Sequence, residues 1–132
     1  MKKIPDFILF DDDPVNNTLC QITIKNTLKG AKIKTFTSPT KGFQYISTEY
    51  SKNVDNYAIL FLDINMRGMT CWEFLEQFER LDESLRAKFK IYILSASISS
   101  LDKQRAALNK NISDFIAKPL TGEKILKIVS LN

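Results

Sequence analysis

Histidine is absent from the 132-residue chain, so any reaction that needs an imidazole must take it from another molecule. Cysteine occurs only twice, at Cys20 and Cys71, and this spacing matches no pattern of zinc ligands. Two isolated thiols in an intracellular chain are typically packed and unpaired. We therefore expect neither a zinc site nor a disulfide bond.

Long hydrophobic runs are also missing. No stretch reaches the roughly 18 apolar residues that indicate a transmembrane helix. The apolar run at Phe7–Phe10 ends directly at acidic residues, so the N-terminal segment lacks the pattern of a signal peptide. We expect a cytoplasmic protein without membrane insertion.

A basic stripe is the third missing feature. The formal net charge is +4, from 19 Lys and Arg against 15 Asp and Glu. These basic residues are scattered, and the densest group is KGAKIK at residues 29–34. Nucleic-acid binding usually needs a clustered basic surface or a recognisable motif, so we do not expect a nucleic-acid partner.

The pattern that is present alternates short apolar runs with longer amphipathic stretches. Strands are predicted at residues 7–10, 33–36, 58–62, 91–94 and 115–117. Short continuous apolar runs bounded by polar residues are typical of strands buried on both faces. Alternation with helices predicts an α/β fold, a (βα)5 doubly wound parallel five-stranded sheet. The length fits a single domain over residues 1–132, with no output domain attached.

Five helices are predicted from apolar residues at helical spacing. These residues are Val15, Leu19, Ile22 and Leu28; Phe43, Ile46 and Tyr50; Phe74, Leu75, Phe78 and Leu81; Leu101 and Leu108; and Ile125, Leu126, Ile128 and Val129. Helix starts are indicated by a capping-box spacing at Thr70 and Glu73, by Ser38 before a proline, and by Thr121.

Polar side chains follow the predicted strands where each strand ends. Asp11, Asp12 and Asp13 follow the first strand, Asp63 the third, Ser95 the fourth and Lys118 the fifth. In a parallel α/β sheet, ligands bind beyond the carboxyl ends of the strands. We therefore expect these groups to meet in one cleft.

The chemistry of this set favours phosphoryl transfer. Crowded carboxylates raise one another's pKa values unless a cation neutralises them, and Mg²⁺ binds through one or two carboxylates while tolerating phosphate. Lys118 is a mobile charge suited to a phosphoryl oxygen, and Ser95 offers a hydroxyl donor. Aspartate can form an aspartyl phosphate, so Asp63 is a candidate nucleophile. Taken alone, Asp63 also fits a simple turn residue.

In this order, these residues resemble the receiver domain of two-component response regulators, from Phe7 to Leu131. The resemblance implies a flavodoxin-like strand order 2-1-3-4-5 and Asp63 as the phosphoacceptor. It also implies a site built from Asp11, Asp12, Asp63 and the Asn65 backbone carbonyl for Mg²⁺ (or Mn²⁺), Ser95 and Lys118 for phosphate, Phe115 for switching, and Asn65 and Ser97 for tuning dephosphorylation. Asp13 is expected to flank the site.

The resemblance also implies the partners. A sensor histidine kinase or histidine phosphotransfer protein would donate the phosphoryl group, and phosphorylation would switch a surface that docks a downstream protein target. The chain would then be no enzyme in the usual sense, although it would assist its own phosphotransfer and dephosphorylation. The face formed by the last strand and last helix is a candidate surface for a homodimer.

One loop departs from the family pattern. The family usually has Met-Pro-x-Met-Asp-Gly after the acceptor, whereas residues 66–71 read MRGMTC. Arg67 lacks the fixed φ of proline and lies beside the permissive Gly68, so we expect a more mobile loop, with effects on partner docking and metal geometry. Thr70 can still cap the following helix.

Two alternatives remain open at this point. Asp11, Asp13 and Val15 fit the start of haloacid-dehalogenase-type phosphatases, in which Asp11 would be the nucleophile and Asp13 the acid. Those enzymes need a late acid pair, but only Glu123 follows Lys118. The other alternative is a receiver-like interaction module that is never phosphorylated.

Overall fold

The structure is a computed structural model that describes residues 4–53, 55–97 and 99–132. Its main sheet has five parallel strands: β1 (Asp6–Phe10), β2 (Ile33–Phe36), β3 (Ala58–Leu62), β6 (Phe89–Ser95) and β7 (Ile112–Ala117). Their spatial order is β2-β1-β3-β6-β7, which is 2-1-3-4-5 when the five are counted along the chain. The expected doubly wound sheet and its order are confirmed.

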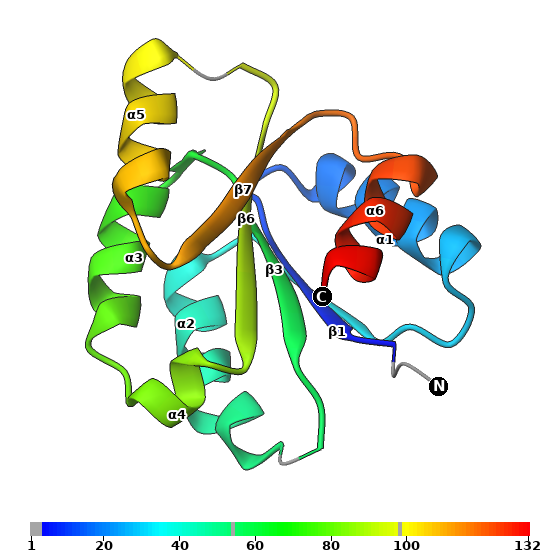
Figure 1. Cartoon of the computed structure of the whole chain (residues 1–132), viewed down its shortest axis with the longest axis horizontal. Coiled ribbons are helices and arrows are strands. Elements are labelled where there is room, and N and C mark those ends of the chain that lie inside the picture. The colour runs from blue at the N-terminus through cyan, green and yellow to red at the C-terminus, as the bar shows by residue number, and fades with distance from the viewer. Residues whose placement is uncertain (1–3, 54, 98) are drawn as a thin grey trace.

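Helices cover both faces of the sheet (Figure 1). On one face lie α1 (Pro14–Thr27) and α6 (Gly122–Leu131), and on the other lie α2 (Pro39–Thr48), α3 (Cys71–Glu79), α4 (Glu83–Arg86) and α5 (Ser100–Leu108). A 3₁₀ turn, η1 (Tyr50–Lys52), follows α2. A separate antiparallel hairpin joins β4 (Asn65–Met66) to β5 (Met69–Thr70). No described helix combines the length and apolar character needed to cross a membrane.

Two hydrophobic cores form because successive strand residues point to opposite faces. In β1, Phe7 and Leu9 enter the core beneath α1 and α6, while Ile8 and Phe10 enter the other core. All five residues of β3 are buried. The edge strands β2 and β7 are only partly buried, so burial on both faces was wrong for them. The helix layers cover the middle of the sheet more completely than its edges.

The helix starts follow the predicted caps. Ser38 accepts a hydrogen bond from the Lys41 backbone N–H at the start of α2, and Thr121 caps α6 in the same way. At α3 the capping box is complete, with Thr70 and Glu73 each accepting from the other's backbone N–H. These local signals fixed where the helices begin.

In two helices, most of the apolar residues that indicated the helix are exposed to solvent. In α1, Val15, Leu19 and Ile22 are 64%, 58% and 51% exposed, and the interior face is Asn17, Cys20 and Ile24. In α5, the residues Leu101 and Leu108 are exposed and Ala106 is buried. Hydrophobic spacing identified these helices correctly. The apolar residues that indicated these two helices are mostly not the residues that face the sheet. Both cysteines are buried and unpaired, as expected.

Candidate functional site

Three carboxylates converge beyond the carboxyl ends of β1 and β3. One ligand oxygen each from Asp11, Asp12 and Asp63 lies within 4.8 Å of the others. The two strands are neighbours in the sheet, and the Asp63 backbone N–H donates to the Phe10 carbonyl at 2.9 Å. Strand pairing therefore fixes the distance between residues that lie about fifty positions apart in the sequence.

Asp11 is a buried acid, with only 4% of the residue exposed. Its carboxylate accepts hydrogen bonds from Lys118 Nζ at 2.8 Å, from Asn16 Nδ2 at 2.7 Å and from the Asp13 backbone N–H at 2.9 Å. A buried charge is tolerated when it is paired and hydrogen-bonded in this way. The Asn17 side chain donates to the Asp11 carbonyl at 2.9 Å and so holds the backbone as well.

Lys118 reaches the acids from the end of β7. Its Nζ lies 3.7 Å from Asp63 Oδ1, and its backbone N–H donates to the Ser95 carbonyl at 2.9 Å. Burial alone would lower the pKa of Lys118, but the hydrogen bond to Asp11 and the charges of Asp63 and Asp11 outweigh burial and raise it. The ammonium group is therefore held in its charged form.

The fold raises the pKa of Asp63 above its ordinary value. Burial is the main cause, and the charges of Asp11 and Asp12 add to it. The Lys118 charge and the Ile64 backbone N–H, which donates at 3.0 Å, act in the opposite direction. One lysine thus only partly compensates three crowded acids. Hard oxygen donors in this arrangement fit Mg²⁺, which would supply the missing positive charge.

The other predicted site residues lie around this cluster. The Ser95 hydroxyl donates to the Ser97 carbonyl at 2.8 Å, and Ser97 itself is exposed. Asn65 is the exposed first residue of β4. Phe115 is half-buried on β7, where it packs against the core on the α3 side, and Lys103 Nζ lies 5.4 Å from its ring centroid. The Ser95 hydroxyl is thus bonded to the loop that follows it, and the Phe115 ring packs against the core.

The chain matches the family model of the response regulator receiver domain over residues 7–130. The chain belongs to this family. Comparison with curated proteins gave no match.

Solved structures of other receivers have the same fold. A two-component response regulator from Cytophaga hutchinsonii aligns with a TM-score of 0.86 and 25% identity, covering 99% of this chain and 100% of that chain. A two-component response regulator from Legionella pneumophila aligns at 0.76 and 25%, covering 97% and 99%. The chemotaxis response regulator CheY4 of Vibrio cholerae aligns at 0.73 and 18%, covering 98% of each chain.

Within this receiver domain, three contributors to the site were missed by sequence reasoning. Asn16 and Asn17 hold Asp11 from the first turns of α1, and the Arg67 backbone N–H donates to Asp12 Oδ2 at 3.2 Å. The adjacent asparagines could have been noticed from their spacing after Asp11. The backbone donor could not, because every residue except proline has one.

Asp13 takes a structural role in the receiver domain. Its carboxylate accepts from the Val15 backbone N–H at 3.0 Å and caps α1. The acidic cluster within the described ranges consists of Asp11, Asp12 and Asp63, without Asp13. In the phosphatase alternative, Asp13 would act as an acid beside Asp11. The structure does not support that role, because the Asp13 carboxylate caps α1 instead.

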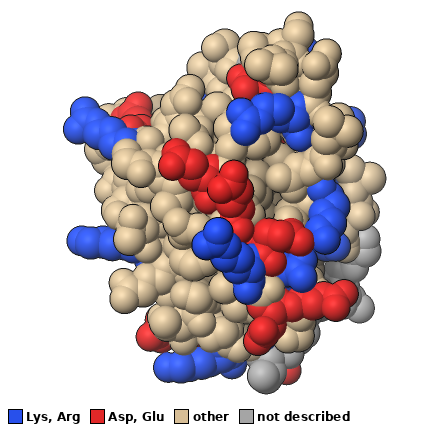
Figure 2. Space-filling view, turned by 90° about the vertical axis from the view of Figure 1, so that its left-hand side faces the viewer, with Lys and Arg blue, Asp and Glu red and all other residues tan. Residues whose placement is uncertain are grey.

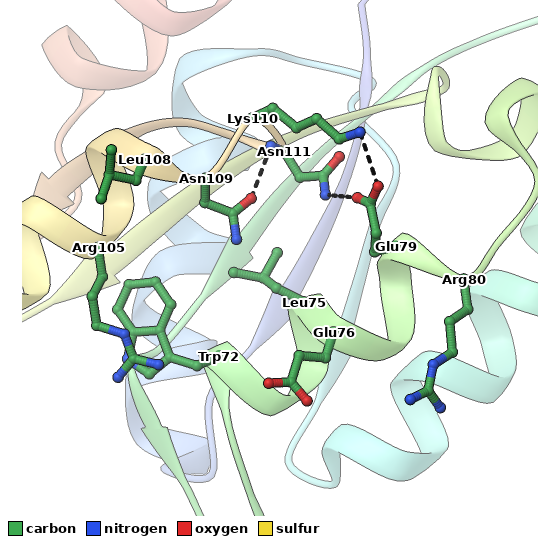
Figure 3. A pocket seen from close by; sticks show the side chains of 10 residues that line it. All are labelled: Trp72, Leu75, Glu76, Glu79, Arg80, Arg105, Leu108, Asn109, Lys110 and Asn111. Carbon is green, nitrogen blue, oxygen red and sulfur yellow. Dashed lines mark hydrogen bonds and ion pairs between the residues drawn. The ribbon is translucent and has the colours of Figure 1, made fainter.

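A larger cavity of about 750 Å³ lies elsewhere, between α3 and the segment that joins α5 to β7 (Figure 3). Its polar side chains are mostly paired with one another: Glu79 binds Lys110 and Asn111, and Arg105 lies over the Trp72 ring at 4.4 Å. The cavity has room, but no set of convergent, uncompensated groups. Crowded and only partly compensated carboxylates lie at the small acidic site instead.

The surface charges on the side of α3 and α5 are mixed. Figure 2 shows acidic and basic side chains interleaved on this face, with broad uncharged areas between them. A surface that tracks a nucleic-acid backbone is usually a patch or stripe of one sign. This face offers no such stripe.

Proposed function

We propose that this receiver domain accepts a phosphoryl group on Asp63 from a phosphohistidine of a sensor histidine kinase or a histidine phosphotransfer protein. The observation that carries the proposal is the meeting of Asp63 with Asp11 and Asp12 within 4.8 Å, and with Lys118 at 3.7 Å. The absence of histidine from the chain agrees with an imidazole supplied by the partner.

The transfer step is a displacement at phosphorus. A carboxylate oxygen of Asp63 attacks, the new P–O bond forms, and the P–N bond to the donor imidazole breaks. The departing nitrogen keeps the electron pair and takes up a proton. Lys118 is close enough to Asp63 to stabilise the negative charge that develops on the phosphoryl oxygens. The Ser95 hydroxyl becomes a second donor once it leaves the Ser97 carbonyl.

Mg²⁺ (or Mn²⁺) is the expected cofactor, held by Asp11, Asp12, Asp63 and the Asn65 carbonyl. When bound, it would neutralise charge on the acids and on the phosphoryl oxygens. Asn65, the first residue of β4, and Ser97, just after β6, lie two positions past Asp63 and Ser95. We assign them to the handling of the water that later hydrolyses the aspartyl phosphate.

Phosphorylation supplies the switch. The phosphoryl group adds about −1.5 to −2 charges, which would draw the Ser95 hydroxyl toward Asp63. Phe115 could then turn into the space that Ser95 leaves. Because Phe115 lies on β7, this change would reach the surface of α5, β7 and α6 that we assign to a downstream protein target. A homodimer through the same surface stays a prediction, as does the cytoplasmic setting.

Phosphate labelling tests the acceptor. The wild-type chain should take up about one phosphoryl group per molecule from a small phosphodonor such as acetyl phosphate, only with Mg²⁺ present, and Asp63→Asn should abolish uptake. The matched control is Asp13→Asn, because asparagine caps a helix as well as aspartate does. Persistent labelling of the Asp63→Asn variant would sink the assignment.

The same variants separate the remaining alternatives. Continuous turnover of a phosphomonoester that is lost in Asp13→Asn would indicate the phosphatase. Failure of the wild-type chain to bind beryllofluoride in the presence of Mg²⁺ would indicate an interaction module that is never phosphorylated. We expect stoichiometric labelling without turnover, as for a signalling component rather than a conventional enzyme.

A further inference from the structure

The loop after Asp63 forms an antiparallel hairpin with a tight turn. Met66 pairs with Met69, so Arg67 and Gly68 are the two central residues of the turn. Gly68 has φ of 84°, whereas no described non-glycine residue has a positive φ. A negative φ followed by a positive φ at glycine is the pattern of a type II turn. In that turn the N–H of the first central residue is free to bond outside the hairpin.

The first central N–H bonds to the acidic cluster. The Arg67 backbone N–H donates to Asp12 Oδ2 at 3.2 Å, across 55 positions of sequence. Asp12 is one of the three acids whose oxygens lie within 4.8 Å. The bond occupies one oxygen of the Asp12 carboxylate and leaves the other available to a cation. It also ties Asp12 to the hairpin that begins with Asn65, the source of the expected carbonyl ligand.

We propose that the backbone amide of Arg67 positions Asp12 for the divalent cation, an inference that rests on the metal site of the proposed function. Ligating carboxylates are commonly oriented by a hydrogen bond to the oxygen that does not bind the metal, and loss of such a partner typically costs 10–100-fold in metal affinity. The Arg67 side chain is not needed for this role. Its charge would, if anything, oppose a cation.

A backbone donor can be removed with a proline, and this turn is suited to that experiment. Proline is favoured at the first central position of a type II turn. The preceding residue, Met66, lies in a strand, which is the conformation that a following proline prefers. Arg67→Pro should therefore keep the hairpin and delete the N–H. Arg67→Ala is the matched control, because it removes the charged side chain and keeps the N–H.

Calorimetric titration of the unphosphorylated protein with Mg²⁺ tests the proposal. We expect the Kd for Mg²⁺ to rise roughly tenfold in Arg67→Pro, the low end of the range because the bond is exposed, and to stay within about twofold of wild type in Arg67→Ala. Thermal unfolding in EDTA should be similar for all three proteins. Equal affinity in Arg67→Pro, tighter binding in it, or equal losses in both variants would overturn the proposal.

A second measurement uses only the wild-type chain. The amide proton of residue 67, followed by NMR hydrogen exchange, should remain protected when Mg²⁺ saturates the site. Loss of protection on metal binding would mean that the cation displaces the amide, and the proposal would then be wrong. If the wild-type chain binds no Mg²⁺, the proposed function fails before this inference is reached.

Discussion

At the scale of single residues, the site combines charges that the folded chain tolerates poorly without a cation. Asp63 has its pKa raised by burial and by Asp11 and Asp12, with Lys118 as a partial counterweight. Functional sites often keep such destabilising groups at a cost in stability. The Asp63 carboxylate is therefore expected to make the metal-free fold less stable than a neutral replacement would.

Asp63→Asn should raise the free energy of unfolding in EDTA at neutral pH by about 1 kcal/mol. The pKa of Asp63 is higher in the folded state than in the unfolded state. Asp63 therefore contributes most to the stability of the wild-type protein below its unfolded-state pKa, and this contribution is lost as pH rises through its folded-state pKa. The advantage of the variant should thus shrink on acidification. Urea unfolding followed by circular dichroism at several pH values measures this.

The control for this prediction is Asp82→Asn, which neutralises an exposed acid outside the cluster. It should change stability little at any of these pH values. An Asp63→Asn protein less stable than wild type at neutral pH would show that pairing with Lys118 outweighs burial and like-charge repulsion.

How much of the site could be predicted also depends on the type of residue. Asp11, Asp12, Asp63 and Lys118 stand at strand ends, so strand topology alone brings them together. The hydrogen bond from Asn16 to Asp11 depends on the precise turn into α1, and the hydrogen bond from Arg67 to Asp12 depends on one backbone N–H. Such contacts need coordinates, because residue type does not encode them.

At the scale of elements, α1 shows where periodicity is ambiguous. Its apolar stripe of Val15, Leu19 and Ile22 indicated the helix, but these residues lie in solvent. The sheet is met instead by Cys20 and Ile24, with Asn17 supporting Asp11. A short apolar stripe shows that a helix is amphipathic. It does not say whether the partner of that stripe is the same chain or another one.

The exposed stripe on α1 lies directly after the acidic loop, where the phosphodonor protein of the proposed function would approach Asp63. A helix with an unpartnered apolar face is suited to packing against another helical surface. Leu19→Gln should therefore slow phosphotransfer from the cognate donor protein by about tenfold. It should leave labelling by acetyl phosphate unchanged, because that small donor makes no contact with α1.

Leu108→Gln on α5 is the matched control, since Leu108 is even more exposed and lies on the other face of the sheet. The measurement is a quenched time course that follows the transfer of labelled phosphate from the phosphorylated donor protein to the receiver. Equal slowing by both variants, or slower labelling by acetyl phosphate in Leu19→Gln, would remove α1 from the docking role.

At the scale of the whole molecule, the (βα)5 alternation and four of the five strand ends followed from the sequence pattern. The strand order came only with the family resemblance, because apolar runs carry no information about which strand lies beside which. The hairpin of β4 and β5 and the short α4 were not predicted. Both are too short to produce a periodic signal.

The two cores should open as one unit, because β1 and β3 supply alternate residues to both. Each core contains one free cysteine: Cys20 lies on the inner face of α1, and Cys71 is the first residue of α3. Burial raises the pKa of the Cys71 thiol to about 12 and also raises that of Cys20, so neither forms a reactive thiolate in the folded protein at pH 8.

Alkylation with iodoacetamide, followed by peptide mass spectrometry, should therefore label both cysteines slowly in buffer. Their labelling rates should increase with urea at the same slope, because both require loss of the shared strands. Concentrated urea is the control, since both thiols should then react as free cysteine does. If Cys20 reacts earlier and with a shallower slope, the layer of α1 and α6 separates from the sheet by itself. The side of the molecule that carries Asn16 and the exposed stripe would then be the more mobile half of the fold.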